Sequence, residues 1–138
     1  MNSTRGFTLM ELLVVIAIIA ILVSVVLGSL KDARDGGLEA KVKSEMTTLG
    51  KRAAVEESKL FTYDSVCGSN GVPQAIEVIN IITSIELFSV GPVVCHSNSD
   101  AFAASVPLDV NYWCIDSTGT SKEVLTSLSS TTPTYVCP

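Results

Sequence analysis

A single apolar run near the N-terminus constrains this 138-residue chain more than any other feature. From Leu12 to Leu27 the sequence reads LLVVIAIIAILVSVVL, in which Ser24 is the only polar residue. A helix needs about 20 apolar residues to cross a bilayer core, whereas the apolar core of a secretory signal is shorter, about 7 to 15 residues. We therefore expect residues 7–30 to form a membrane-spanning helix that is retained in the mature chain.

The charges at the start of the run predict its orientation and a first candidate site. Arg5 is the only charged side chain before the run, and positive charge there keeps this end in the cytoplasm and the rest of the chain outside. Glu11 places a carboxylate one turn into the helix, which is costly unless the charge is paired and so indicates a functional residue. The alternative is a position at the level of the lipid headgroups, where the cost is small.

The segment Arg5-Gly6-Phe7-Thr8-Leu9-Met10-Glu11, followed by LLVVIAIIAIL, strongly resembles the N-terminus of type IV prepilins and secretion pseudopilins. The resemblance implies a short leader at residues 1–6. Prepilin peptidase would cut between Gly6 and Phe7 on the cytoplasmic face and methylate the new amino group of Phe7. Glu11 would then neutralise the Phe7 amine of a neighbouring subunit in a filament. Such a buried pair favours one register between subunits more than it adds stability.

Apolar residues at intervals of three to five continue beyond Leu27, which indicates that the helix goes on with one buried stripe. We expect one helix from about residue 7 to 57, with an amphipathic half at residues 31–59. Gly28, Gly36 and Gly37 are candidate helix breaks, because glycine in a helix interior costs roughly 0.5 to 1 kcal/mol relative to alanine. The resemblance to pilins implies unwinding near Gly28 in a filament; simple tolerance or close helix packing is the alternative.

Residues 60–138 are expected to form a globular head. Turn residues divide this region into a loop at 62–70, a helix or strand at 73–83, and strands at 85–90, 93–95, 101–106, 111–115 and 122–125. Trp113 is the expected core anchor. Short antiparallel strands packed on the amphipathic half of the long helix give an α+β fold.

Four cysteines lie in the head, at positions 67, 95, 114 and 137. None has the close spacing of metal-ligand pairs, and an even number outside a membrane favours two disulfides over free or metal-bound thiols. Spacing does not select among the three possible pairings. We expect Cys67–Cys95 and Cys114–Cys137, the second of which would fasten the Ser/Thr-rich tail at residues 127–134 to the sheet.

The remaining charges and polar residues argue against catalysis and nucleic-acid binding. Residues 60–138 carry a net charge of −6, so this surface repels phosphates and direct nucleic-acid binding is not expected. His96 is the only histidine, and no glycine-rich phosphate loop follows a strand. The spacing of Asp100, Asp109 and Asp116 matches no calcium loop, so we expect solvated loop acids. We expect no enzyme activity, no cofactor and no metal.

The sequence therefore predicts a structural subunit of a type IV pilus, a major or major-like pilin that serves adhesion, motility or DNA uptake. The resemblance implies as partners other copies of the chain, prepilin peptidase and an inner-membrane assembly machinery. The subunit would lie in the cytoplasmic membrane before assembly and in an extracellular filament afterwards. A pseudopilin of type II secretion is the alternative within the family, which four cysteines and the missing calcium signature disfavour. An alternative of another class is a membrane-anchored binding domain that never polymerises, which predicts no cleavage at Gly6 and tolerance of Glu11→Ala.

Overall fold

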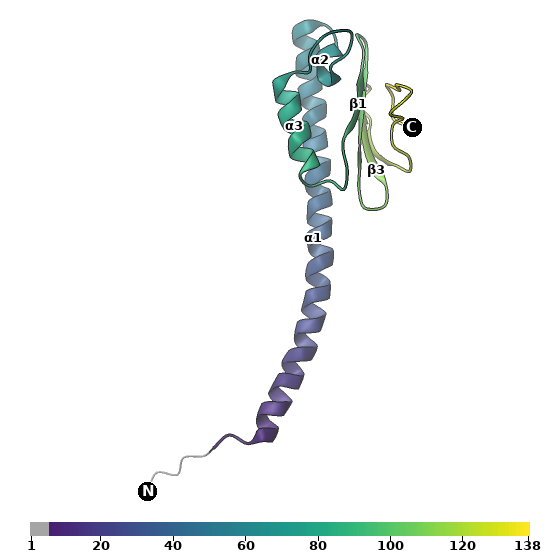
Figure 1. The fold of residues 1–138 in the computed structure, drawn as a ribbon. Coiled ribbons are helices and arrows are strands. Elements are labelled where there is room, and N and C mark those ends of the chain that lie inside the picture. Colours follow the sequence, from purple (N-terminus) through teal and green to yellow (C-terminus); the bar gives the residue numbers. More distant parts are fainter. Residues whose placement is uncertain (1–5) are drawn as a thin grey trace. The chain divides into compact units, whose positions relative to one another are not determined.

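The computed structural model describes residues 6–138, so Arg5 and most of the expected leader lie outside the described residues. The chain forms two compact units, Met1–Gly37 and Leu38–Pro138. A long helix and a four-stranded antiparallel sheet confirm the α+β fold (Figure 1). The elements are α1 (Leu9–Leu60), α2 (Asp64–Cys67), α3 (Ile76–Glu86), β1 (Val94–Ser97), β2 (Phe102–Pro107), β3 (Tyr112–Asp116) and β4 (Ser121–Val124).

The first unit includes the apolar part of α1, whose side chains are exposed. All residues from 6 to 37 are exposed, and by length and composition α1 is apolar enough to cross a membrane. The helix continues through Gly28, Gly36 and Gly37, and a Cβ at any of them would meet no described atom within 4 Å. The helix of the isolated chain therefore tolerates these glycines, and a break at them on assembly stays a prediction.

The second unit is built on a sheet with the strand order β1-β2-β3-β4, in which every neighbouring pair is antiparallel. Its four strands confirm the strands expected near residues 93–95, 101–106, 111–115 and 122–125. Alternate residues of β2 face opposite sides: Phe102 and Ala104 join one apolar cluster, whereas Ala103 joins another. Both faces of the sheet are therefore covered.

The inner face of the sheet packs on the amphipathic part of α1. Val42, Met46, Leu49 and Ala53 are at most 1% exposed, as their spacing in the sequence predicts for one buried stripe. Trp113 packs only partly buried against this core. The ammonium of Lys43 lies 4.9 Å from the centre of its ring and forms ion pairs with Glu39 and Glu123, which fastens edge strand β4 to α1.

Two expectations for residues 60–90 are wrong. The strand expected at residues 85–90 does not form, because the segment before it is helix α3 and includes Ile85. Val78 and Ile85 are fully buried seven residues apart, so a helical spacing of buried side chains overrides the strand preference of β-branched residues. The loop expected at residues 62–70 contains the short helix α2.

The segment around α2 is fixed by contacts with distant residues. The disulfide Cys67–Cys95 joins α2 to β1, and the backbone N–H of Cys67 donates a hydrogen bond to Ser97 Oγ at 3.2 Å. Asp64 Oδ1 accepts hydrogen bonds from the side chains of Ser69 and Asn70, each at 2.8 Å, which holds the pKa of Asp64 below its ordinary value. These partners lie outside the helix itself, so the local pattern alone does not indicate it.

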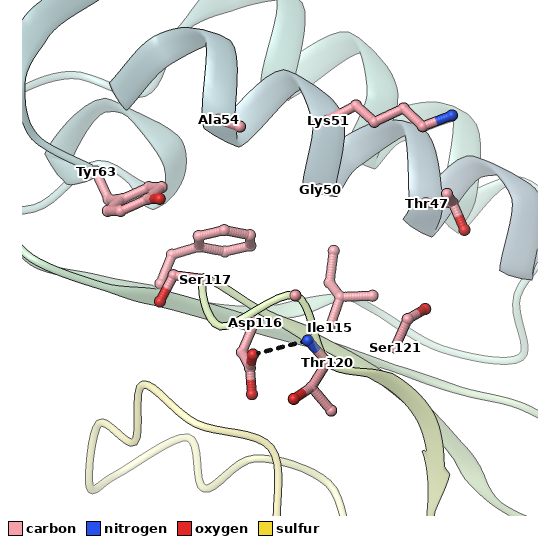
Figure 2. Close-up of a pocket in the computed structure, with 12 residues that line it drawn as sticks. Thr47, Gly50, Lys51, Ala54, Tyr63, Ile115, Asp116, Ser117, Thr120 and Ser121 are labelled. Carbon is pink, nitrogen blue, oxygen red and sulfur yellow. Dashed lines mark hydrogen bonds between the residues drawn. The ribbon is translucent and has the colours of Figure 1, made fainter. Parts of the chain in front are cut away.

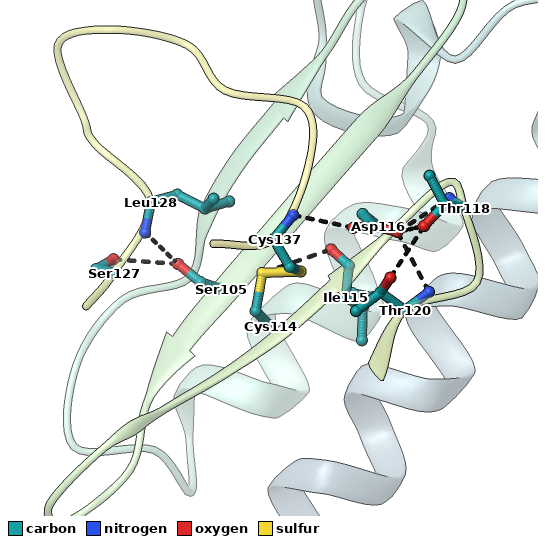
Figure 3. Close-up of a disulfide and its surroundings, with 9 residues drawn as sticks. All are labelled: Ser105, Cys114, Ile115, Asp116, Thr118, Thr120, Ser127, Leu128 and Cys137. Carbon is teal, nitrogen blue, oxygen red and sulfur yellow. Dashed lines mark hydrogen bonds between the residues drawn. A yellow bond between two sulfur atoms is a disulfide. The ribbon is translucent and has the colours of Figure 1, made fainter. Parts of the chain in front are cut away.

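The C-terminal tail covers the outer face of the sheet. The disulfide Cys114–Cys137 joins the end of the chain to β3 (Figure 3), and both disulfides have the pairing expected from the sequence. Leu128 is buried against this face, and its N–H donates to Ser105 Oγ at 3.1 Å. The tail therefore buries the outer face that a four-stranded sheet would otherwise expose.

Asp116 closes the tail onto the β3–β4 turn and is not the solvated loop acid that we expected. Its side chain is buried, and its Oδ2 accepts the N–H of Cys137 at 2.9 Å (Figure 3). Its Oδ1 accepts the N–H groups of Thr118 and Thr120, at 2.9 and 3.2 Å, and the Thr118 hydroxyl at 2.6 Å. Burial alone would raise the pKa of Asp116, but these hydrogen bonds outweigh it and hold the pKa below its ordinary value of 3.8.

We predict that Asp116→Asn lowers the free energy of unfolding by about 1 to 3 kcal/mol and loosens the tail. An asparagine amide can still accept hydrogen bonds from the turn, but its NH₂ group would then face the N–H of Cys137, placing two donors against each other. Thermal unfolding measures the loss, and amide exchange at Cys137 reports the loosening. The control is Asp109→Asn, because Asp109 is an exposed aspartate. Equal stability of the two variants would contradict this role of Asp116.

The depressed pKa also predicts how stability depends on pH. The contribution of Asp116 is complete above the ordinary pKa of 3.8 and is lost as the pH falls through the lower pKa of the folded state. The amide NMR signals of Thr118, Thr120 and Cys137 should therefore shift together at a pH below 3.8. A common midpoint above pH 3.8 would show that the hydrogen bonds to Asp116 do not favour its carboxylate form.

Candidate processing and assembly site

The Gly6–Phe7 peptide bond lies in a non-helical segment that precedes α1. A Cβ on Gly6 would meet no described atom within 4 Å, and the side chain of Phe7 is 82% exposed. A non-helical, exposed segment is accessible to a peptidase. Gly6 and Phe7 at the expected processing site are both exposed.

Thr8 and Glu11 form a reciprocal cap at the start of α1. Glu11 Oε2 accepts the N–H of Thr8 at 3.0 Å and its hydroxyl at 2.8 Å, while the N–H of Glu11 donates to Thr8 Oγ1 at 3.2 Å. This arrangement is a capping box, which satisfies N–H groups that the first turn of a helix leaves without partners. The cap holds the Glu11 carboxylate at the positive end of the helix dipole.

Sequence reasoning missed the role of Thr8, although a signal was present. Threonine followed three residues later by glutamate, just before an apolar run, is the pattern of a capping box. From the sequence we considered Glu11 as a charge in a membrane or filament, or at the level of the lipid headgroups, and not as part of a helix cap. The structure shows that its carboxylate also begins the helix.

The other oxygen of this carboxylate, Oε1, accepts no hydrogen bond from the described residues. The sequence contains no charged residue between Glu11 and Lys31, so the apolar part of α1 supplies no cation to pair with it. The neighbouring side chains are exposed and apolar, including Leu9 at 80% and Met10 at 76%. A cation that pairs with an ionised Glu11 in an apolar environment must therefore come from outside the apolar part of this helix.

The remaining residues singled out from the sequence lie elsewhere. Gly28, Gly36 and Gly37 are in the interior of α1, and the four cysteines form the two disulfides of the second unit. Within residues 6–138, no group of three or more His, Cys, Asp or Glu side chains is arranged to hold a metal ion.

We predict that Thr8→Val removes the hydroxyl half of the cap, while the backbone N–H of residue 8 can still donate to Glu11 Oε2. Valine keeps the branched shape of threonine but cannot accept the N–H of Glu11, so this amide should exchange with solvent faster. Hydrogen exchange on the full chain in detergent micelles measures the effect. Thr8→Ser keeps the hydroxyl and serves as the matched control. Unchanged exchange at Glu11 in Thr8→Val would show that the hydroxyl does not cap the helix.

The comparisons with known proteins bear on this same segment. The family described as the prokaryotic N-terminal methylation motif matches residues 1–27. The chain has no significant match among curated proteins or solved structures. The motif implies processing by prepilin peptidase and indicates a structural protein rather than an enzyme. The N-terminal segment of this chain thus carries the type IV prepilin signature, which supports a type IV pilin-like or pseudopilin protein.

Proposed function

We propose that this chain is a major or major-like subunit of a type IV pilus, cut between Gly6 and Phe7 and assembled through α1. The observation that carries the proposal is the state of Glu11. Its carboxylate accepts hydrogen bonds from Thr8, its Oε1 has no partner among residues 6–138, and the apolar part of its own helix contains no cation. Cleavage at Gly6 creates a new cation, the amine of Phe7, on every copy of the chain.

An intersubunit pair between Glu11 and this amine explains how copies would align. An unpaired charge among packed apolar helices is costly, so subunits whose offset leaves Glu11 alone are disfavoured. Only the offset that brings a neighbour's Phe7 amine to the free Oε1 removes this cost. Removing one partner of a buried ion pair destabilises a structure far more than replacing the whole pair with apolar residues. Such a pair therefore selects the register in which both charges meet.

The apolar surface of α1 also favours assembly over a simple anchor. Residues 12–27 are apolar around the whole helix and exposed on every side. A helix that is apolar all round needs an apolar environment on every side, which a bilayer provides first and packed α1 helices provide afterwards. In this proposal the subunit leaves the cytoplasmic membrane for an extracellular filament that serves adhesion, motility or DNA uptake.

The head favours a pilus over the pseudopilin alternative. Two disulfides stabilise a small domain in an oxidising environment, as expected for a filament exposed outside the cell. Asp116 is one of the three acids that could have bound a cation together. Its carboxylate already accepts the N–H of Cys137 in the tail. These two features support the pilus subunit.

We predict that the mature protein begins at an N-methylated Phe7. Mass spectrometry of surface filaments sheared from a host with prepilin peptidase would detect this N-terminal peptide. Gly6→Leu should block the cut, with Gly28→Leu as a control for the substitution itself. A mature chain that begins at unmodified Met1 in such a host would overturn the proposal. Methylated Phe7 found only in the cell envelope would favour the pseudopilin.

We also predict that Glu11→Gln lowers the yield of sheared filaments roughly tenfold or more, while the precursor still enters the membrane. Glutamine keeps the shape and the hydrogen-bond acceptor that Thr8 uses but lacks the charge that neutralises an amine. Asp32→Asn removes a negative charge from the same helix and should leave the yield unchanged. Normal filaments from Glu11→Gln would point to the non-polymerising membrane-anchored domain.

A further inference from the structure

A shallow groove of about 320 Å³ lies in the second unit between α1 and the β3–β4 turn (Figure 2). The helix contributes the small residues Thr47, Gly50 and Ala54, whose spacing of three to four places them along one side of the helix. The lining also includes Phe102 and Ile115 from the sheet, both of them core residues. Small side chains on one wall and apolar ones beneath them leave room for a partner's apolar side chain.

Lys51 adds an unused positive charge to the edge of this groove. Figure 2 shows its side chain extended along α1 on the helical side of the groove. It is exposed and forms no ion pair with any of residues 6–138. The other bases of this part of α1, including Lys43 and Arg52, are all paired with carboxylates.

A complementary projection lies at the other end of β3. Asp109 and Val110 form the exposed tip of the β2–β3 turn, and Val110 is 84% exposed. Leu108 holds the base of the turn, because its side chain is buried and its N–H donates to the carbonyl of Asn111 at 2.7 Å. Asp109 forms no ion pair with the described residues. The tip is thus a rigid apolar side chain beside a free carboxylate.

The groove and the tip lie at opposite ends of one strand. Asn111 alone separates the tip from Tyr112, the first residue of β3, and the groove is lined by residues from Ile115 to Ser121. The five residues of β3 span roughly 17 Å at about 3.3 Å per residue. One head therefore cannot fill its own groove with its own tip, whereas a second copy can.

We propose that heads of successive copies join through this pair, with the Asp109–Val110 tip of one copy docked in the groove of the next. Val110 would lie over Phe102 and Ile115, and Asp109 would pair with Lys51. Contacts between two different patches of identical chains are heterologous, and they extend as an open filament when the rotation between copies does not close a ring. This inference rests on the proposed function, because it assumes that copies assemble.

Other exposed apolar tips of the head fit the groove less well. Leu87 is 75% exposed, but the carboxylate next to it, Glu86, already accepts the N–H of Val93 at 3.0 Å. Leu125 is 84% exposed, but its neighbours in the sequence, Val124 and Thr126, carry no charge. Of these three positions, only Val110 has beside it a carboxylate, that of Asp109, that is free to pair with Lys51.

A charge exchange tests the ionic part of the contact. We expect Lys51→Glu and Asp109→Lys each to make sheared filaments roughly two- to fivefold shorter in electron micrographs, and the double variant to restore the length. Asp100 is an exposed acid in the β1–β2 turn, so Lys51→Glu with Asp100→Lys is the matched control and should not recover. Circular dichroism and a count of free thiols confirm that each head folds.

Cross-linking tests the apolar part of the contact independently. The described cysteines are all in disulfides, so Thr47→Cys with Val110→Cys introduces the only reactive pair. Oxidation of assembled filaments should give a ladder of covalent multimers, and either single substitution should give none. The docking would be overturned if filaments are normal but give no ladder, and if the charge exchange does not restore filament length. That result would leave the pilus proposal intact. A product that stops at dimers would also overturn the docking, whereas a wild-type chain that never polymerises would refute the proposed function and the docking together.

Discussion

The apolar surface of the first half of α1 is the constraint on which the rest of the structure depends. No residue from 6 to 37 is covered by the rest of the chain, and the helix is apolar around its whole circumference over residues 12–27. Water is a poor solvent for such a surface, so lipid or other apolar helices must cover it. Glu11 makes this requirement specific, since a carboxylate at the start of the run needs a cation that the run does not contain.

The core of the head is built from residues of the second unit. The stripe of α1 from Val42 to Ala53 fills the inner face of the sheet, and the tail covers the outer face. The disulfide Cys67–Cys95 fastens α2 to β1, and Cys114–Cys137 fastens the C-terminal tail to β3.

Local periodicity predicted most of the elements, and contacts between distant residues explain where it failed. The long helix and the four strands follow from spacings of 3.6 and 2, which act within a few residues. The segment from Pro73 to Val90 has β-branched residues that suit either structure, so burial of Val78 and Ile85 in the core decided for a helix. The role of Asp116 could not be predicted, because its partner Cys137 is 21 residues away in the sequence.

The sequence by itself determined the apolar helix, the N-terminal methylation motif at residues 1–27 and the Glu11 carboxylate at the start of the apolar run. Each of these is a local property, carried by the order of residues near the N-terminus. Only the tertiary structure decided that Asp116 clasps the tail, that Lys51 stands unpaired beside a groove, and that Asp109 and Val110 project from the opposite end of β3. Those features depend on which strands pair and on which face of α1 the sheet covers. Hydrogen bonding and burial determine this pairing and this face only when the whole head packs.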